Sequence, residues 1–324
     1  MLSPPLYLDF SRKQGEWVAN RFGGRENLEA IDFIRRFNSV VHELYPNALT
    51  IAEESTAWPS VTRPVEEGGL GFDYKWNMGW MHDTLQYFAN DPVYRAYHHG
   101  TLTFSLLYAF SERASSSPFP MMKSSISSGA CWTKCPVLTS GREVRQSATA
   151  LHMWSHPGRK LLFMGGEFGQ WQEWSEARAL DWFLLDEDPQ HAQLKDMVQE
   201  LNRLLATERP LYEDDYSWDG FQWLDLHDYE RSILAYIRKS PSTGESIQTV
   251  LNFTPVVRHG YRLGVPEPGI YEELFTSDDE KYGGSGIVNT PRPSMDIPAH
   301  GQPHSIEMML PPLGAVYLKK QNDT

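Results

Sequence analysis

The apolar residues near the start of the chain recur at helical spacing. They stand every three or four positions, at Leu28, Ile31, Ile34, Phe37, Val41 and Leu44. This period predicts an amphipathic helix with one inward-facing stripe. A short apolar run at residues 48–52 then predicts a buried strand, and the chain turns acidic directly after it, at Glu53 and Glu54.

The same order of elements recurs further along the chain. Residues 161–164 form a second apolar run, followed by two glycines and Glu167. A second helical stripe follows, with Leu194, Met197, Val198, Leu201 and Leu205 inward. Strands that end in acidic loops, alternating with helices, are typical of a (β/α)₈ TIM barrel, in which catalytic groups lie on the loops after the strands. We therefore expect an α/β fold for residues 1–210.

After Pro210 the pattern changes to alternation with a period of two residues. The stretch "FQWLDLHDYERSILAYIRKS" predicts two strands around a polar turn, and "SIQTVLNFTP", "HSIEMMLPPL" and "GAVYLKK" continue in the same way. Residues 211–324 are therefore expected to form an all-β sandwich domain.

Composition narrows the class of ligand. The net charge of -13 argues against nucleic-acid or anionic-membrane partners. We expect no signal peptide and no membrane span, and the two cysteines suit a reducing, cytoplasmic compartment. Cys131 and Cys135 have no matching pair of ligands elsewhere, so no metal site is expected. With charged partners disfavoured, we expect a neutral ligand by elimination.

Aromatic residues point to a sugar as that ligand. The block "GFDYKWNMGWMHD" at residues 71–83 alternates large rings with polar groups and glycines. Rings can support the flat C–H faces of a sugar while amides and carboxylates bind its hydroxyls. Trp76, Asn77 and Trp80 are the candidate substrate contacts. The alternative is that these residues pack beneath a strand, as most aromatic residues do.

Several long blocks carry a family resemblance. "LYLDFSRKQGEWVANRFGGRENLEAIDF", "TIAEEST", "GGLGFDYKWNMGWMHDTLQYF", "KLLFMGGEFGQWQEW" and "HGQPHSIEMMLPPL" together resemble the carboxyl-terminal half of bacterial glycogen (1,4-α-glucan) branching enzymes, which belong to the α-amylase superfamily. The resemblance implies the carboxyl-terminal part of a (β/α)₈ barrel followed by a β-sandwich. It also implies an α-glucan substrate such as glycogen or amylose-like chains, no cofactor or metal, and a monomer.

The resemblance assigns the chemistry to carboxylates. It implies retaining transglycosylation, which needs an aspartate nucleophile and a glutamic acid that acts as acid and then as base. The acid/base maps to Glu53, whose neighbours Ala52 and Trp58 would shield its carboxyl from water. The resemblance gives Glu54 and Glu167 no catalytic role. The nucleophile of the family lies upstream of the block that matches "LYLDFSRK", so we expect this chain to lack it.

A Ser-rich segment at about residues 114–152 does not match the family. Where the family has "SHDEVVH", which supplies a third carboxylate, this chain has "FPMMKSS". Met-Met-Lys can only be encoded by ATG ATG AA(A/G), and the overlapping frame of that string reads Asp-Glu. We therefore interpret the segment as an out-of-frame translation, and we expect it to disrupt the strand and prevent a competent barrel.

Three functions follow from these observations. The first is a 1,4-α-glucan branching enzyme present as a truncated, inactive fragment. The second is a non-catalytic glucan-binding remnant that uses the aromatic residues. The third is a half-enzyme that is complemented by a separate amino-terminal chain.

Overall fold

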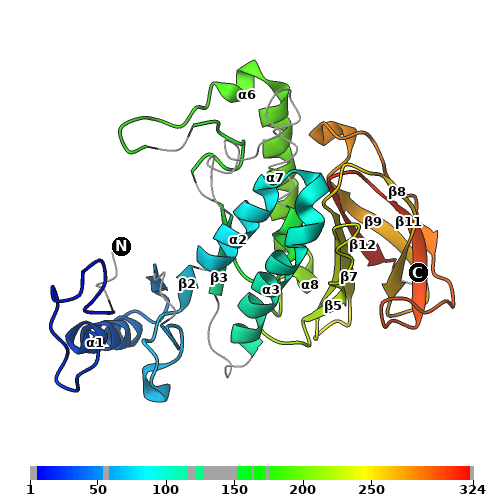
Figure 1. Ribbon diagram of the computed structural model, residues 1–324. Helices are drawn as coiled ribbons and strands as arrows, with labels where there is room; N and C mark the ends of the chain where they lie inside the picture. The colour runs from blue at the N-terminus through cyan, green and yellow to red at the C-terminus, as the bar shows by residue number, and fades with distance from the viewer. Residues whose placement is uncertain are drawn as a thin grey trace.

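The computed structural model describes residues 6–53, 58–76, 78–114, 122–126, 152–162, 164–172 and 175–321 (Figure 1). Cys131, Cys135 and most of the segment interpreted as out of frame lie outside these residues. The described part begins with helices that alternate with short strands. In chain order these are α1 (Leu28–Leu44), β1 (Ile51–Ala52), η1 (Val65–Glu67), β2 (Tyr74–Trp76), α2 (Met78–Ala89), η2 (Pro92–Tyr94), α3 (Arg95–Ala114), β3 (Met122–Ile126), η3 (His152–Ser155) and β4 (Lys160–Leu162).

The four strands form one parallel sheet in the order β1-β2-β3-β4. Ile51 of β1 pairs with Tyr74 of β2, and Lys75 of β2 pairs with Met122 of β3. Ser124 of β3 in turn pairs with Lys160 of β4. The expectation that the Ser-rich segment would break this sheet is therefore wrong for residues 122–126, which form a strand with a partner on each side. Backbone pairing uses the N–H and C=O groups that every residue except proline carries, so these residues can form a strand whatever the family has at this place.

Helix α1 has the predicted bounds but only part of the predicted buried stripe. Asn27 caps it by accepting a hydrogen bond from the backbone N–H of Ala30, as Asn commonly does at this position. Ile31 and Ile34 are buried, whereas Phe37 and Leu44 are exposed. The sequence period correctly identified the helix, but it could not show that the second half of its apolar stripe has no cover among the described residues.

A second group of helices links the parallel sheet to the rest of the chain. It consists of α6 (Leu184–Glu187), α7 (Pro189–Thr207) and α8 (Arg209–Tyr212). Helix α7 confirms the sequence prediction for Leu194, Met197, Val198 and Leu201, which are buried, whereas Leu205 is half-buried. Its start is set by Asp188, whose side chain accepts from the N–H of Gln190, and by Pro189 in the first turn.

The rest of the chain is all-β apart from η4 (Glu280–Tyr282). Its strands are β5 (Phe221–Asp225), β6 (Ile233–Lys239), β7 (Ser246–Asn252), β8 (Arg258–Val265), β9 (Ile270–Thr276), β10 (Arg292–Pro293), β11 (His304–Leu310) and β12 (Gly314–Lys320). They form an antiparallel six-stranded sheet, β10-β9-β12-β7-β6-β5, and an antiparallel pair, β11-β8. The strands predicted from the sequence correspond to β5, β6, β7, β11 and β12.

The six-stranded sheet is covered on both faces. Along β6, Ile233, Ala235 and Ile237 pack into one cluster with residues of the β11-β8 pair. Leu234 and Tyr236, which alternate with them, pack into a second cluster with residues of α2, α3 and α7. Successive side chains of a strand point to opposite faces, so β6 reads as a continuous buried run. Figure 1 shows the helices on one side of this sheet.

A buried arginine fastens α3 to the all-β region. Arg95 donates from Nη1 to the carbonyl oxygen of Phe253 at 2.9 Å and from Nη2 to that of Phe88 at 3.2 Å. The division expected at residue 210 falls within α8, and a core cluster includes residues from both sides of it. The two-domain division stays a prediction.

Candidate active site

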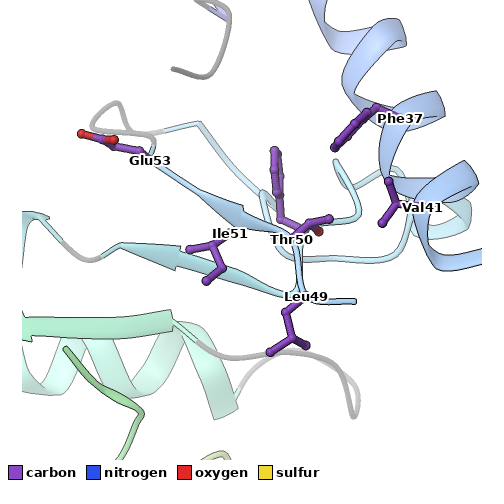
Figure 2. Close-up of a pocket in the computed structure, with 7 residues that line it drawn as sticks. Phe37, Val41, Leu49, Thr50, Ile51 and Glu53 are labelled. Atoms are coloured by element: carbon purple, nitrogen blue, oxygen red, sulfur yellow. The ribbon is translucent and has the colours of Figure 1, made fainter. Parts of the chain in front are cut away.

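Glu53 follows β1 directly, at the carboxyl end of the parallel sheet. Its side chain is exposed, and Figure 2 shows its carboxyl group directed away from Phe37 and Val41 of α1. Ala52 is buried, but Trp58 packs against Tyr7 with ring centroids 5.2 Å apart. The expectation that these neighbours would shield Glu53 from water is therefore wrong for the described residues. Its position after a parallel strand agrees with the sequence prediction.

Asp73 fixes the strand that carries Glu53. Its Oδ2 accepts from the backbone N–H of Thr50 at 2.6 Å and lies 3.1 Å from the Thr50 hydroxyl. The same oxygen lies 2.9 Å from Nε2 of His42 in the last turn of α1. The Asp73 carboxylate, directly before β2, thus contacts the last turn of α1 and the residue before β1. The carbonyl oxygen of Thr50 accepts from the N–H groups of Asp73 and Tyr74, which closes the connection.

Sequence reasoning missed this role for Asp73. The residue lies in the aromatic block that was read for substrate contacts, directly before β2. Its signal was its place at the start of a strand, where a carboxylate can bind backbone N–H groups. Asp73 thereby holds the start of the segment that leads through β1 to Glu53.

An apolar pocket of about 380 Å³ lies beside Glu53 (Figure 2). It is lined by residues of α1, of the β1 segment and of the segment before β2, namely Phe37, Val41, Leu49, Thr50, Ile51, Glu53 and Phe72. Glu53 is the one ionisable residue among them. A sugar would meet few hydrogen-bonding groups here, so this pocket is better suited to apolar side chains than to a glucan.

Two of the three candidate substrate contacts lie within the described residues. Trp76 is the last residue of β2, and its backbone pairs with Lys123 of β3. Asn77 lies outside the described residues. Trp80 lies in α2 and is only 2% exposed, within the core cluster that also contains Tyr87 and Phe88. Its burial favours the packing alternative over substrate contact.

The remaining sequence expectations concern two other glutamates, a metal site and a membrane span. Glu167 is half-buried in the turn that follows β4, while Glu54 lies outside the described residues. In the described ranges, no three His, Cys, Asp or Glu residues come together as a metal site would require. No helix in these ranges combines the length and the apolar character needed to cross a bilayer.

Comparison with known proteins shows which fold this chain shares. Residues 223–321 match the family model of the α-amylase carboxyl-terminal all-β domain. The structure resembles that of the α-amylase of Geobacillus thermoleovorans complexed with acarbose, with a TM-score of 0.63, 14% identity, and coverage of 91% of this chain and 58% of that one. It also resembles the α-amylase of Anoxybacillus, with a TM-score of 0.61, 13% identity, and coverage of 91% of this chain and 57% of that one. These similarities show an α-amylase-like fold.

Similarity in sequence is much closer. The chain is 49% identical over 316 residues to a 1,4-α-glucan branching enzyme of Rhizobium etli, covering 97% of this chain and 43% of that protein. It is 49% identical over 319 residues to the 1,4-α-glucan branching enzyme of Aquifex aeolicus, covering 98% of this chain and 50% of that protein. The chain thus spans half or less of the length of these two relatives. The chain corresponds to the carboxyl-terminal part of these 1,4-α-glucan branching enzymes, and its residues 223–321 match the α-amylase carboxyl-terminal all-β domain.

Proposed function

We propose that this chain is the carboxyl-terminal part of a 1,4-α-glucan branching enzyme and contributes its general acid/base, Glu53. The observation that carries the proposal is the position of Glu53, directly after a strand of a parallel sheet, in a chain about half identical to branching enzymes over nearly its whole length. We further propose that β1 to β4 are the last strands of a (β/α)₈ barrel, because catalytic groups of such barrels follow the carboxyl ends of the strands.

The reaction that this position supports proceeds in two steps. Glu53 would protonate the leaving oxygen of an α-1,4 link while an aspartate forms a covalent ester with the glucan. Glu53, now a carboxylate, would then take the proton from a C6 hydroxyl of the acceptor, which attacks the ester and forms the α-1,6 branch. Its exposure leaves the carboxyl accessible to a large glucan.

The reaction needs carboxylates that Glu53 cannot replace. In a retaining mechanism the nucleophile lies only about 5 Å from the acid/base. We propose that it comes from the amino-terminal part of the family, which the match to the Rhizobium etli relative leaves uncovered. The third carboxylate would lie in the segment at about residues 114–152, which we interpret as out of frame. The polypeptide of residues 1–324 should therefore not branch amylose by itself, and sequencing the encoding DNA tests the change of frame.

A chimaera tests the role of Glu53. The amino-terminal half of the Aquifex aeolicus relative is joined to this chain, and the segment at residues 114–152 is replaced by its counterpart from that relative. We expect this protein to shift the spectrum of the amylose–iodine complex. The Glu53→Gln variant should lower the rate by about 10²–10⁴-fold, the usual contribution of general acid–base catalysis. Glu167→Gln is the matched control and should keep most of the activity. Equal rates for both variants would refute the assignment.

Glucan binding without catalysis is the second candidate, and exposed tryptophans favour it. Trp171, Trp182 and Trp218 are each about half exposed. The Trp182 ring packs at a tilt of 35° against that of Phe168, with ring centroids 4.7 Å apart, so it is held in place and still accessible. Co-sedimentation of the 324-residue chain with glycogen tests this role. Binding that is lost in Trp182→Ala would support it, and a chain that stays in the supernatant would exclude it.

A further inference from the structure

A buried histidine holds an exposed tryptophan on the loop that follows β4. Trp171 is 47% exposed, whereas His191, in the first turn of α7, is 1% exposed. The indole Nε1–H of Trp171 donates to Nε2 of His191 at 2.7 Å. A half-exposed side chain otherwise has several rotamers open to it, and this bond selects one of them. The ring of Trp171 is therefore fixed although much of it faces solvent.

The second nitrogen of His191 determines which tautomer makes this bond. Its Nδ1 lies 2.6 Å from the carbonyl oxygen of Phe168. A carbonyl oxygen only accepts hydrogen bonds, so Nδ1 must carry the ring proton, which leaves Nε2 as an acceptor for the indole N–H. Both nitrogens of the neutral imidazole are thus used. The imidazole links the backbone of the loop to the Trp171 side chain.

The loop that carries this tryptophan is itself held in place. Phe168 is 0% exposed, and its ring packs against that of Trp182. Gln170, which is 1% exposed, accepts at Oε1 from the backbone N–H of Asp181 at 2.9 Å. The backbone N–H of Gln170 donates to the carbonyl oxygen of Gly165 at 3.0 Å. These bonds join the start of the loop to its end, so the tryptophan stands on a fixed base.

The bond to His191 also decides how Trp171 can meet a ligand. The indole N–H, the one polar group of this side chain, is used inside the protein, so the ring offers only carbon surface to solvent. The C–H face of a hexose matches such a surface. Gln172, the next residue, is exposed, and the guanidinium of Arg178 donates to its Oε1. An apolar ring with an amide and a guanidinium nearby favours a sugar, whose hydroxyls these polar groups can bind.

The loop lies at the same end of the sheet as Glu53. It follows β4, as Glu53 follows β1, and β1 to β4 all run parallel. Groups on the loops after parallel strands gather at the carboxyl end of the sheet. The order β1-β2-β3-β4 separates β1 from β4 by three strand spacings, about 14 Å along the sheet. A maltooligosaccharide that contacts Glu53 can therefore extend to this loop.

We propose that His191 is a positioning residue for a glucan subsite, in which the fixed ring of Trp171 stacks on one glucosyl unit of the chain that Glu53 helps to cleave. This inference rests on the proposed function, and it names a binding position and the residue that maintains it. A ring that is ordered beforehand does not have to be ordered when the glucan binds, and ordering a side chain on binding reduces affinity. His191 thus favours binding without touching the sugar.

Titration calorimetry of the 324-residue chain with maltoheptaose tests the proposal. His191→Leu removes the acceptor of the indole N–H and should raise the Kd by about 2- to 12-fold, the usual cost of ordering one side chain on binding. Trp171→Ala removes the ring and should raise the Kd at least as much. In the Trp171→Ala background, His191→Leu should have no further effect, because His191 acts through that ring. His191→Gln keeps an acceptor and should restore most of the affinity.

The indole N–H reports on the fixed ring directly. In a chain labelled with ¹⁵N-tryptophan, the Trp171 resonance is the one that is absent from Trp171→Phe. The bond to the imidazole should slow exchange of this proton with water, and His191→Leu should remove the protection while His191→Gln retains it. His99→Gln is the matched control, because His99 is also 1% exposed but contacts the hydroxyl of Tyr87. It should leave the protection and the Kd unchanged, and circular dichroism shows whether each variant keeps its fold.

Three results would overturn the proposal. They are a chain that does not bind maltoheptaose, an unchanged Kd in Trp171→Ala, and an effect of His191→Leu that persists in the Trp171→Ala background. Binding and catalysis are measured in different proteins, so the two proposals can fail separately. Trp171-dependent binding beside a Glu53→Gln chimaera that keeps full branching activity would refute the acid/base assignment alone. A chimaera that depends on Glu53, with no Trp171-dependent binding, would refute the subsite alone.

Discussion

A buried ion pair in the second half of the chain should be one of its most sensitive points. Arg238 of β6 is 0% exposed, and its Nη2 lies 2.8 Å from Oδ1 of Asp215, which is 3% exposed. The guanidinium also donates to the backbone carbonyl oxygens of Ser155 at 2.9 Å and Asp214 at 3.2 Å. It therefore ties β6 to η3 and to the segment after α8. The perturbation is Asp215→Asn, which keeps the shape of the side chain and removes its charge.

The size of the effect follows from the burial of both groups. A guanidinium that keeps its place without a counter-charge carries the full cost of leaving water, and breaking such a pair from one side costs about 3–5 kcal/mol. That is about a fifth or more of the stability of a typical domain, which is about 5–15 kcal/mol. Replacing both partners, as in Arg238→Met with Asp215→Asn, leaves no buried charge. The double variant should therefore recover part of the loss.

Urea unfolding followed by tryptophan fluorescence measures these differences. The midpoint should fall for Asp215→Asn while the slope with urea stays constant. The control is Glu200→Gln, which removes a helical pair with Arg203 whose side chains are 26% and 56% exposed. Exposed pairs contribute about 0–1 kcal/mol, so this variant should remain near the unmodified chain. If Asp215→Asn loses no more stability than Glu200→Gln, the reasoning from burial is refuted.

Two further predictions concern pH and backbone space. Burial lowers the pKa of His99 to about 4, with a smaller opposing effect of Asp228, so the unfolded chain binds more protons than the folded one between about pH 4 and 6.5. The free energy of unfolding should therefore decrease as pH falls through this range, which urea unfolding at pH 7 and pH 5 measures. His99→Gln should make this decrease smaller. The exposed control His98→Gln should leave it unchanged. Gly264→Ala should destabilise the chain, because the added Cβ would lie 2.1 Å from the Ala299 carbonyl oxygen. At Gly100 of α3 no atom lies within 4 Å of the added Cβ, so Gly100→Ala should raise the free energy of unfolding by about 0.5–1 kcal/mol and raise the thermal midpoint. Equal midpoints for the two variants would contradict this prediction.

The sequence predicted elements best where the period of apolar residues matched their burial. Helix α7 is the clearest case, because its stripe packs against the six-stranded sheet and every residue from Leu194 to Leu201 that was expected inward is buried. Strands β5 and β6 were predicted from alternation around a polar turn, and they pair as expected. In both cases the partner surface is large and apolar, so local pattern and tertiary burial agree.

Other elements depended on contacts that no local pattern contains. Strand β8 was missed because Gly260 and Gly264 interrupt its apolar pattern, and it is defined by pairing with β11, some 40 residues away in the chain. Trp80 looked like a sugar contact because polar groups and glycines surround it in sequence, yet α2 places it in the core. Asp73 was overlooked because its three contacts come from α1 and β1, which the sequence could not place beside it.

The six-stranded sheet that is covered on both faces has a consequence for the modular use of this region. A fragment cut near residue 210 would keep the β11-β8 pair on one face and lose α2, α3 and α7 from the other, baring Leu234, Tyr236 and Leu251. We expect such an excised fragment to aggregate in solution. Transfer of this region to another enzyme should succeed only if α2, α3 and α7 are transferred with it. The unit that can be exchanged between proteins is therefore larger than the all-β region alone.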